Sequence, residues 1–210
     1  MDCITYPALD AGPNQMPAIA TGLISGDGGR VRQSYLFNSS SGYFQASGFV
    51  LLGQNYRPHS FAMWIRPVTS VTNGGTILHV SSNNVGTGWC VPFIGLSLAG
   101  QIVLNSYNGT GVPTVVGPVL TLGFWVHIAY TYSSTNGIRL YVNGALYGQS
   151  GAFNFVPSGL PMYVTLGQSL SGTICARNVL VPGYFTGEID EVYVYSRELT
   201  AADVTTLANP

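Results

Sequence analysis

Short runs in which apolar and polar residues alternate, broken by Gly, Pro, Asn and Ser at intervals of about ten residues, recur along this sequence. Alternation with a period of two places successive side chains on opposite faces of an extended strand. The breakers come too often for helices of roughly 10–15 residues to separate the strands, so βαβ units are excluded. The pattern is typical of an antiparallel sandwich or barrel, and we expect an all-β fold.

The clearest strand is predicted at residues 59–67. His59, Phe61 and Met63 fall on one of its faces, Trp64 falls on the other, and Pro67 closes it. Further strands are expected at residues 76–80, 90–98, 101–107, 124–132, 138–142 and 145–149.

Turn signals connect several of these strands. Asn136-Gly137 and Asn143-Gly144 suit hairpin turns, because both residue types tolerate a positive φ, and Ala99-Gly100 also indicates a hairpin. Residues 10–30, which are rich in Gly and Pro, are expected to form a long irregular connection inside the domain.

One short helix is predicted at the carboxyl end. Thr200 suits its N-cap, and Asp203 stands where a capping box needs an acceptor for the N-cap backbone N–H. Leu199 and Val204 have the spacing of a hydrophobic staple, and Asn209-Pro210 ends the helix.

The composition of the chain limits the number of domains and the kinds of partner that we expect. A chain of 210 residues with 46% hydrophobic side chains, including 13 Tyr, 9 Phe and 3 Trp, can bury one sizeable core, so we expect a single domain spanning residues 1–210. Seven basic and eight acidic residues provide no basic patch for phosphates, which argues against nucleic acid as a partner. No apolar run approaches the ~20 residues of a membrane span, so membrane insertion is not expected.

Cysteines and sequons favour an extracellular setting. Cys3, Cys90 and Cys175 are an odd number, so at most one bridge forms and one thiol remains or pairs outside the chain. Asn38 and Asn108 each begin an Asn-x-Ser/Thr triplet that can accept a glycan in a secreted protein. We favour a Cys3–Cys90 bridge, because the first strand is expected near Cys90 and Cys175 is expected in a loop.

Four groups of segments follow one another in the order and with the separations of a known family: residues 6–10 with Gly12 and Asn14, residues 60–67, residues 125–129 with 140–144, and residues 185–192 with 195–200. Together they resemble the laminin-G-like, concanavalin-A-like jelly-roll family over nearly the whole chain. The resemblance implies a jelly-roll sandwich of two antiparallel sheets. It also implies an extracellular adhesion or carbohydrate-binding module, frequently with a structural calcium ion.

The resemblance carries the family's calcium ligands to Asp10, Asn14 and Asp190, with backbone carbonyls completing the set. Calcium takes six to eight oxygen ligands, so the fold must bring these distant segments together. Pro13 departs from the family's loop pattern. The alternative is that Asp10 caps a turn, Asn14 is solvated and Asp190 hydrogen-bonds its own bulge.

An acidic strand raises the question of hydrolysis. Glucanases of the same fold use Glu-x-Asp-x-Glu, in which all three acids share one face. Here Glu188 and Asp190 share a face, but Val192 occupies the third position and Glu191 points the other way unless a bulge intervenes. No serine nucleophile elbow, P-loop or HExxH motif occurs, so we expect no catalytic residues.

Sugar recognition requires an exposed aromatic ring to stack on the CH face of a sugar. Trp89, beside a polar loop, is the leading candidate, followed by Tyr56 and Tyr107; the alternative for each is core packing. The sequence therefore predicts a non-enzymatic extracellular module that binds a glycan or a matrix protein. The alternative function is a structural subunit of a fibre or matrix, because a Tyr-rich surface of low charge is desolvated at little cost and favours self-assembly.

Overall fold

The computed structural model describes residues 7–9, 12–26, 28–69 and 71–210. Its elements in chain order are β1 (Pro7–Leu9), β2 (Pro17–Thr21), β3 (Ile24–Gly26), β4 (Ser34–Phe37), β5 (Tyr43–Phe49), the 3-10 turn η1 (Leu51–Gly53), β6 (His59–Pro67), β7 (Gly75–Ser81), β8 (Cys90–Leu96), β9 (Gln101–Asn105), β10 (Thr114–Val119), β11 (Val126–Ser133), β12 (Gly137–Val142), β13 (Ala145–Gln149), β14 (Met162–Leu166), β15 (Gly187–Tyr195) and α1 (Ala201–Leu207).

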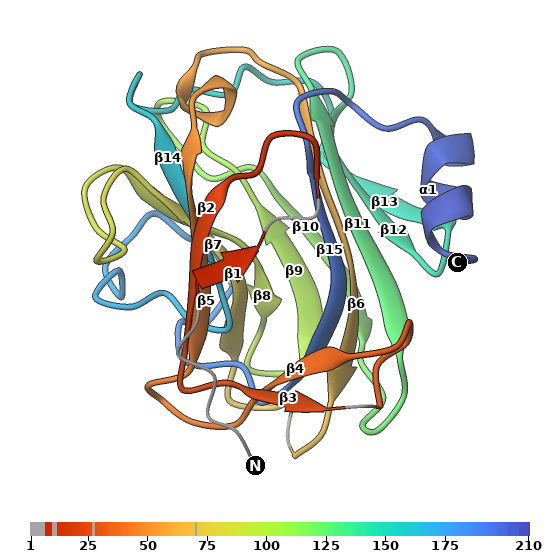
Figure 1. Ribbon diagram of the computed structural model, residues 1–210. Coiled ribbons are helices and arrows are strands. Elements are labelled where there is room, and N and C mark those ends of the chain that lie inside the picture. Colours follow the sequence, from red (N-terminus) through yellow and green to blue (C-terminus); the bar gives the residue numbers. More distant parts are fainter. Residues whose placement is uncertain (1–6, 10–11, 27, 70) are drawn as a thin grey trace.

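The strands form two sheets that face each other (Figure 1). One sheet has the order β1-β2-β5-β14-β7-β8-β9-β10, and the other has the order β13-β12-β11-β6-β15-β4-β3. The strand pairs within both sheets are antiparallel. The predicted all-β sandwich of jelly-roll type, with one short carboxyl-terminal helix, is therefore confirmed.

Strand β6 lies near the centre of its sheet and matches the predicted bounds. It pairs with β11 in a register that sets His59 opposite Tyr132 and Ile65 opposite Val126. The side chain of Met63, on the face predicted to be apolar, is fully buried between the sheets. The alternation read from the sequence is thus the alternation of core and outer faces.

An aromatic cluster fills the space between the sheets. The rings of Phe93 and Tyr130 stack with centroids 5.4 Å apart, and His59 stacks on Tyr130 at 5.6 Å. Phe61 and Phe155 meet these rings edge-on or tilted. Burial of such rings supplies much of the driving force for folding.

Helix α1 covers part of the outer face of the second sheet. The side chain of Thr200 accepts the Asp203 N–H and the carboxylate of Asp203 accepts the Thr200 N–H, so the predicted capping box is confirmed. The staple residues are buried in a cluster with three residues of the sheet: Leu199, Val204, Ala62, Ala129 and Tyr141. In the described part of the chain, no helix has the length and apolarity needed to cross a membrane.

The amino-terminal part of the chain differs from the sequence prediction. Residues 10–30 do not form one irregular connection, because this stretch contains β2 and β3, which pair with β5 and β4. In β2, the buried Ala18 and Ala20 alternate with more exposed residues, but the alternation extends over only five residues.

The turn at Asn143-Gly144 is as predicted, with φ values of 50° and 85°.

Buried histidines make the stability of the fold dependent on pH. Burial lowers the pKa of His59, His79 and His127 from 6.5 to about 4. The unfolded chain binds these protons more tightly, so stability is fully present above pH 6.5 and is lost as the pH falls toward 4. We expect the free energy of unfolding in urea to fall by up to about 1.4 kcal/mol per pH unit for each histidine.

The variant His127→Gln removes one of these groups and should reduce that slope by about one third. Unfolding free energies that stay constant between pH 7 and pH 4.5 would contradict this assignment.

Candidate functional site

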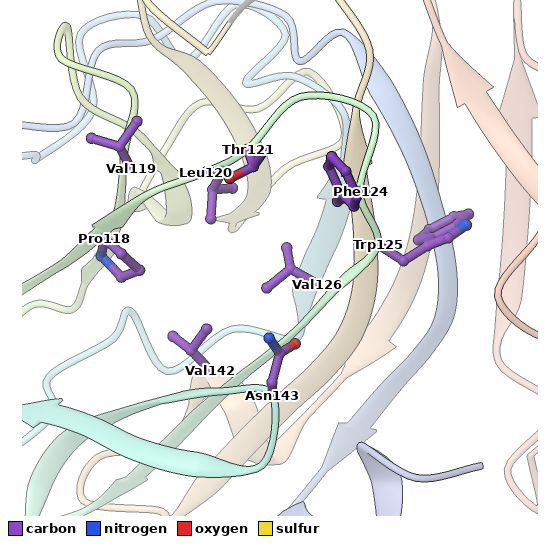
Figure 2. A pocket seen from close by; sticks show the side chains of 9 residues that line it. All are labelled: Pro118, Val119, Leu120, Thr121, Phe124, Trp125, Val126, Val142 and Asn143. Carbon is purple, nitrogen blue, oxygen red and sulfur yellow. The ribbon is translucent and has the colours of Figure 1, made fainter.

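A surface pocket of about 360 Å³ opens where the chain passes from β10 to β11 (Figure 2). The backbone N–H of Gly123 donates to the carbonyl of Pro67 at 2.7 Å, which places the pocket at the end of the sandwich where β6 finishes. The residues that line it are Pro118, Val119, Leu120, Thr121, Phe124, Trp125, Val126, Val142 and Asn143. None of these side chains carries a charge.

Local structure fixes the pocket's floor and its polar wall. Leu120 is buried in the main core and anchors the segment. Asn143 stands at the tight turn between β12 and β13, where its backbone N–H donates to the His127 carbonyl and its Oδ1 accepts the His127 N–H, both at 2.9 Å. Figure 2 shows the amide nitrogen of Asn143 on the pocket side. A donor is thus held in place beside apolar walls.

Phe124 is the most exposed aromatic side chain among the described residues, at 68%. Its neighbour Trp125 points away from the other labelled side chains (Figure 2), and the Arg66 guanidinium lies 5.2 Å from the centre of the Trp125 ring. An exposed ring, a hydroxyl such as that of Thr121 and an amide such as that of Asn143 are the kinds of group that can contact the CH face and the hydroxyls of a sugar.

The sequence did not select this pocket. It assigned residues 124–132 to one continuous strand, whereas β11 begins at Val126 and leaves Phe124 in the loop. The signal that was available is the pair of adjacent aromatics after Gly123, because two neighbours on a strand cannot both face the core.

The predicted sugar-binding residues lie at the opposite end of the sandwich, where β6 begins. All three hydrogen-bond to the segment at residues 155–156. The Trp89 Nε1–H donates to the Val156 carbonyl at 3.1 Å, and the Val156 N–H donates to the Tyr107 carbonyl. The Tyr56 N–H donates to the Phe155 carbonyl. The structure therefore brings all three predicted residues together around one segment.

Contacts within the protein already use much of these side chains. The half-buried ring of Trp89 meets Phe93, Phe155 and Tyr107 edge-on, and the Tyr107 hydroxyl donates to the backbone. Tyr56 is the exposed member, at 54%. Sugar binding at this end stays a prediction.

Two of the three predicted calcium ligands, Asn14 and Asp190, lie among the described residues. Asp10 lies outside them, and Asn14 is exposed on the turn before β2. Asp190 is buried, and its two carboxylate oxygens accept the N–H groups of Val31 and Glu191, each at 2.8 Å. Burial raises the pKa of Asp190, while these hydrogen bonds oppose the rise. The carboxylate hydrogen-bonds its own bulge at Glu191, as in the alternative, and it also ties the loop at Val31 to β15. Calcium binding stays a prediction.

The acidic strand β15 contains a bulge. Glu188 and Asp190 share the outer face, as predicted, opposite Arg66 and Trp64. The register then shifts, and Glu191 adopts a φ of 49°.

Each acid of this strand has a partner within the protein. Arg66 forms a salt bridge with Glu188, and the Tyr193 hydroxyl donates to Glu191. That hydrogen bond raises the pKa of Tyr193 to about 12. On the outer face, the bulge brings Tyr193 to the next position after Asp190, where a glucanase places its second glutamate.

The two sequons lie on loops. Asn38 is exposed after β4, and Asn108 is half-buried, with its Oδ1 accepting N–H groups from Thr110 and Gly111. Glycosylation of either asparagine stays a prediction.

The predicted Cys3–Cys90 bridge is wrong, because Cys90 forms a disulfide with Cys175, with Cα atoms 5.2 Å apart. Cys3 lies outside the described residues. The segment after β14 turns back beside the loop between β7 and β8, where the Ser171 N–H donates to the Val85 carbonyl at 3.0 Å. This return path, which the sequence does not reveal, brings Cys175 to the start of β8.

Comparison by sequence gives a family match. Residues 38–205 match the family model described as the concanavalin A-like lectin/glucanases superfamily. A search of curated proteins finds no matching sequence.

Several solved structures share the fold at low sequence identity. Domain 4 of an extracellular arabinanase from Geobacillus stearothermophilus, solved with arabinotriose, is 21% identical with a TM-score of 0.62, covering 92% of this chain and 88% of that one. The binding domain of botulinum neurotoxin serotype G is 16% identical with a TM-score of 0.66, and the match covers 95% of this chain and 47% of that one. A Trypanosoma rangeli sialidase is 15% identical with a TM-score of 0.64, and the match covers 92% of this chain and 29% of that one. The chain thus spans about half of the neurotoxin domain and less than a third of the sialidase.

Loss of the disulfide should weaken the fold. The bridge joins residues 85 positions apart, so the double variant Cys90→Ser, Cys175→Ser is expected to lower the free energy of unfolding by about 2–5 kcal/mol. Urea unfolding measures the loss, and Cys3→Ser is the control, with a change within roughly 0.5 kcal/mol. A larger loss in the control than in the double variant would contradict the pairing.

Proposed function

The chain belongs to the concanavalin A-like lectin/glucanase superfamily, and on that premise we propose that it is a non-enzymatic, extracellular module that binds a neutral carbohydrate. The observation that carries the proposal is the uncharged pocket beside Phe124. The ring stacks on the CH face of a sugar, while Thr121 and Asn143 hydrogen-bond its hydroxyls.

The size and charge of the pocket narrow the ligand class. A volume of about 360 Å³ is near the lower end of the range of roughly 300–1,000 Å³ for small-molecule sites, which favours a terminal sugar over a long chain. A sialylated or sulfated sugar would need a cation to balance its charge on burial, and the lining contains none. The ligand is therefore neutral.

One of the related structures is consistent with a neutral ligand. The arabinanase domain was solved with arabinotriose, a neutral oligosaccharide. Because the identities are low, these structures support sugar binding as a class and name no sugar for this chain.

The contacts of the acids support a module without hydrolytic activity. Hydrolysis with retention requires two carboxyl groups about 5–5.5 Å apart on either side of the scissile bond. Glu188 is neutralised by Arg66, and Asp190 is held by two backbone N–H groups. An extracellular location is supported by the Cys90–Cys175 disulfide, because such bonds persist in oxidising compartments.

A glycan array followed by calorimetry tests the site. We expect binding to neutral glycans, and Phe124→Ala should weaken it by about tenfold or more, because the stacking ring is lost. The matched variant Tyr56→Ala removes an exposed aromatic from the opposite end of the sandwich and should leave the affinity unchanged. Loss of binding in Tyr56→Ala alone would move the site to the end that contains Trp89 and Tyr107, and loss in neither variant would reject both surfaces.

Assembly into a fibre or matrix is the second candidate function, favoured by one surface. Strands β10 and β13 are the outer edges of their sheets and lie next to each other. Val116 and Val119 on β10 and Leu146 and Tyr147 on β13 are exposed, by 41–56%. An exposed, uncharged strand edge is a template for pairing with another chain.

Size-exclusion chromatography and electron microscopy separate the two functions. For a binding module we expect a monomer at all protein concentrations, with or without glycan. Filaments that Leu146→Lys abolishes, combined with no hit on the array, would instead establish the assembly function.

A further inference from the structure

Four potential metal ligands, two of them the sulfurs of the disulfide, converge at a place apart from the lining of the pocket at Phe124. His79 on β7, Cys90 at the start of β8 and Cys175 place their ligand atoms within 4.8 Å of one another. The carbonyl oxygen of Gly86 lies 2.8 Å from His79 Nε2 and 3.5 Å from Cys175 Sγ. This set combines imidazole, two sulfurs and one oxygen, the ligand types that zinc accepts.

The spacing of these atoms suits a tetrahedral ion. Zinc bonds of about 2.0–2.3 Å hold neighbouring ligand atoms roughly 3.4–3.8 Å apart. The distance from Cys175 Sγ to His79 Nε2 is 4.0 Å, and that from Cys175 Sγ to Gly86 O is 3.5 Å. The distance from His79 Nε2 to Gly86 O is shorter, at 2.8 Å, because a hydrogen bond joins them. To form a coordination shell, the two sulfurs must move apart from bonding distance after reduction, and His79 Nε2 must move slightly away from the Gly86 carbonyl.

Gly172 keeps the space between these atoms open. A Cβ at this position would lie 2.2 Å from the Gly86 oxygen and 2.8 Å from both Cys175 Sγ and His79 Nε2. Any side chain at position 172 would thus enter the centre of the cluster.

The imidazole of His79 is suited to metal binding. The side chain is buried, and burial keeps it neutral by lowering its pKa to about 4. Nε2 donates its proton to the Gly86 carbonyl, and Nδ1 has no hydrogen-bond partner. Transfer of the proton from Nε2 to Nδ1 keeps the ring neutral and exposes an Nε2 lone pair to an ion.

We propose that the cysteine pair has two alternative states: the disulfide, and a zinc site formed after reduction by Cys90 Sγ, Cys175 Sγ, His79 Nε2 and the Gly86 carbonyl. The two states exclude each other, because sulfurs bonded together are not thiolates. A reducing dithiol supplies two electrons and two protons, which break the S–S bond and give two thiols, and the dithiol becomes a disulfide. Zinc then displaces the two thiol protons into solvent.

Both states connect the same parts of the chain. The disulfide links the segment between β14 and β15 to the start of β8, and the zinc ion would link that segment to β7 and β8. The chain would therefore keep this segment docked before oxidation as well as after it. This inference is independent of carbohydrate binding.

The experiment uses the full chain carrying Cys3→Ser, so that only Cys90 and Cys175 supply thiols. The protein is reduced under anaerobic conditions with a phosphine, which takes oxygen from water as it is oxidised. Cobalt(II) is then added as a spectroscopic probe for the zinc site. We expect one equivalent to bind, with thiolate-to-cobalt charge-transfer absorption and tetrahedral visible bands, and added zinc to displace it. The oxidised protein should show neither.

His79→Gln tests whether the histidine is a ligand, and His127→Gln is the matched control for loss of a buried histidine. Loss of an outer-shell partner already costs roughly 10–100-fold in metal affinity, so His79→Gln should lower affinity by at least that factor, with no change in the control. No thiolate-to-cobalt absorption, or equal affinity in both variants, would overturn the proposal.

Reduction could loosen the fold and thereby weaken metal binding, so a second measurement is the Tm of the reduced and oxidised proteins with and without zinc. Zinc should raise the Tm of the reduced protein and leave that of the oxidised protein unchanged, because only a ligand bound to the folded state stabilises it. The same Tm with and without zinc in the reduced protein would overturn the proposal.

Discussion

Packing of uncharged aromatic rings between two sheets is the interaction on which the rest of this structure depends. Phe93, Tyr130 and His59 stack across the interior, and Phe155 closes the cluster from the segment before β14. Only 7% of the residues are charged, so the strands have few groups that resist burial. The inner faces of both sheets form the core, and helix α1 covers part of one outer face. The ends of the sandwich and its edge strands remain accessible to a partner.

Local signals explain how much of this fold was predictable. The bounds of β6, the capping box at Thr200 and the turn at Asn143-Gly144 each depend on residues within one short window. Strands β2 and β3 were missed because they are short and acquire their structure by pairing with β5 and β4, which lie further along the chain. The bulge at Glu191 was left open as an alternative, because only the register of neighbouring strands decides whether it forms.

The candidate site was less predictable, for a related reason. Trp89 was the leading candidate for a stacking ring, with core packing as the alternative, and several of its contacts come from Phe155 and Val156, more than sixty positions away. Phe124 was assigned to a strand, and the strand begins two residues later. The disulfide depends on the return of a long segment beside β7. In each case a tertiary contact decides whether a side chain is structural or available to a ligand.

Nuclear magnetic resonance of the labelled protein, titrated with a neutral glycan that binds it, tests the central claim most directly. We expect chemical shifts to change in one cluster around Thr121, Phe124 and Asn143, at the end of the sandwich where β6 finishes. Shift changes confined to Tyr56, Trp89 and Tyr107, or spread along β13, would contradict it.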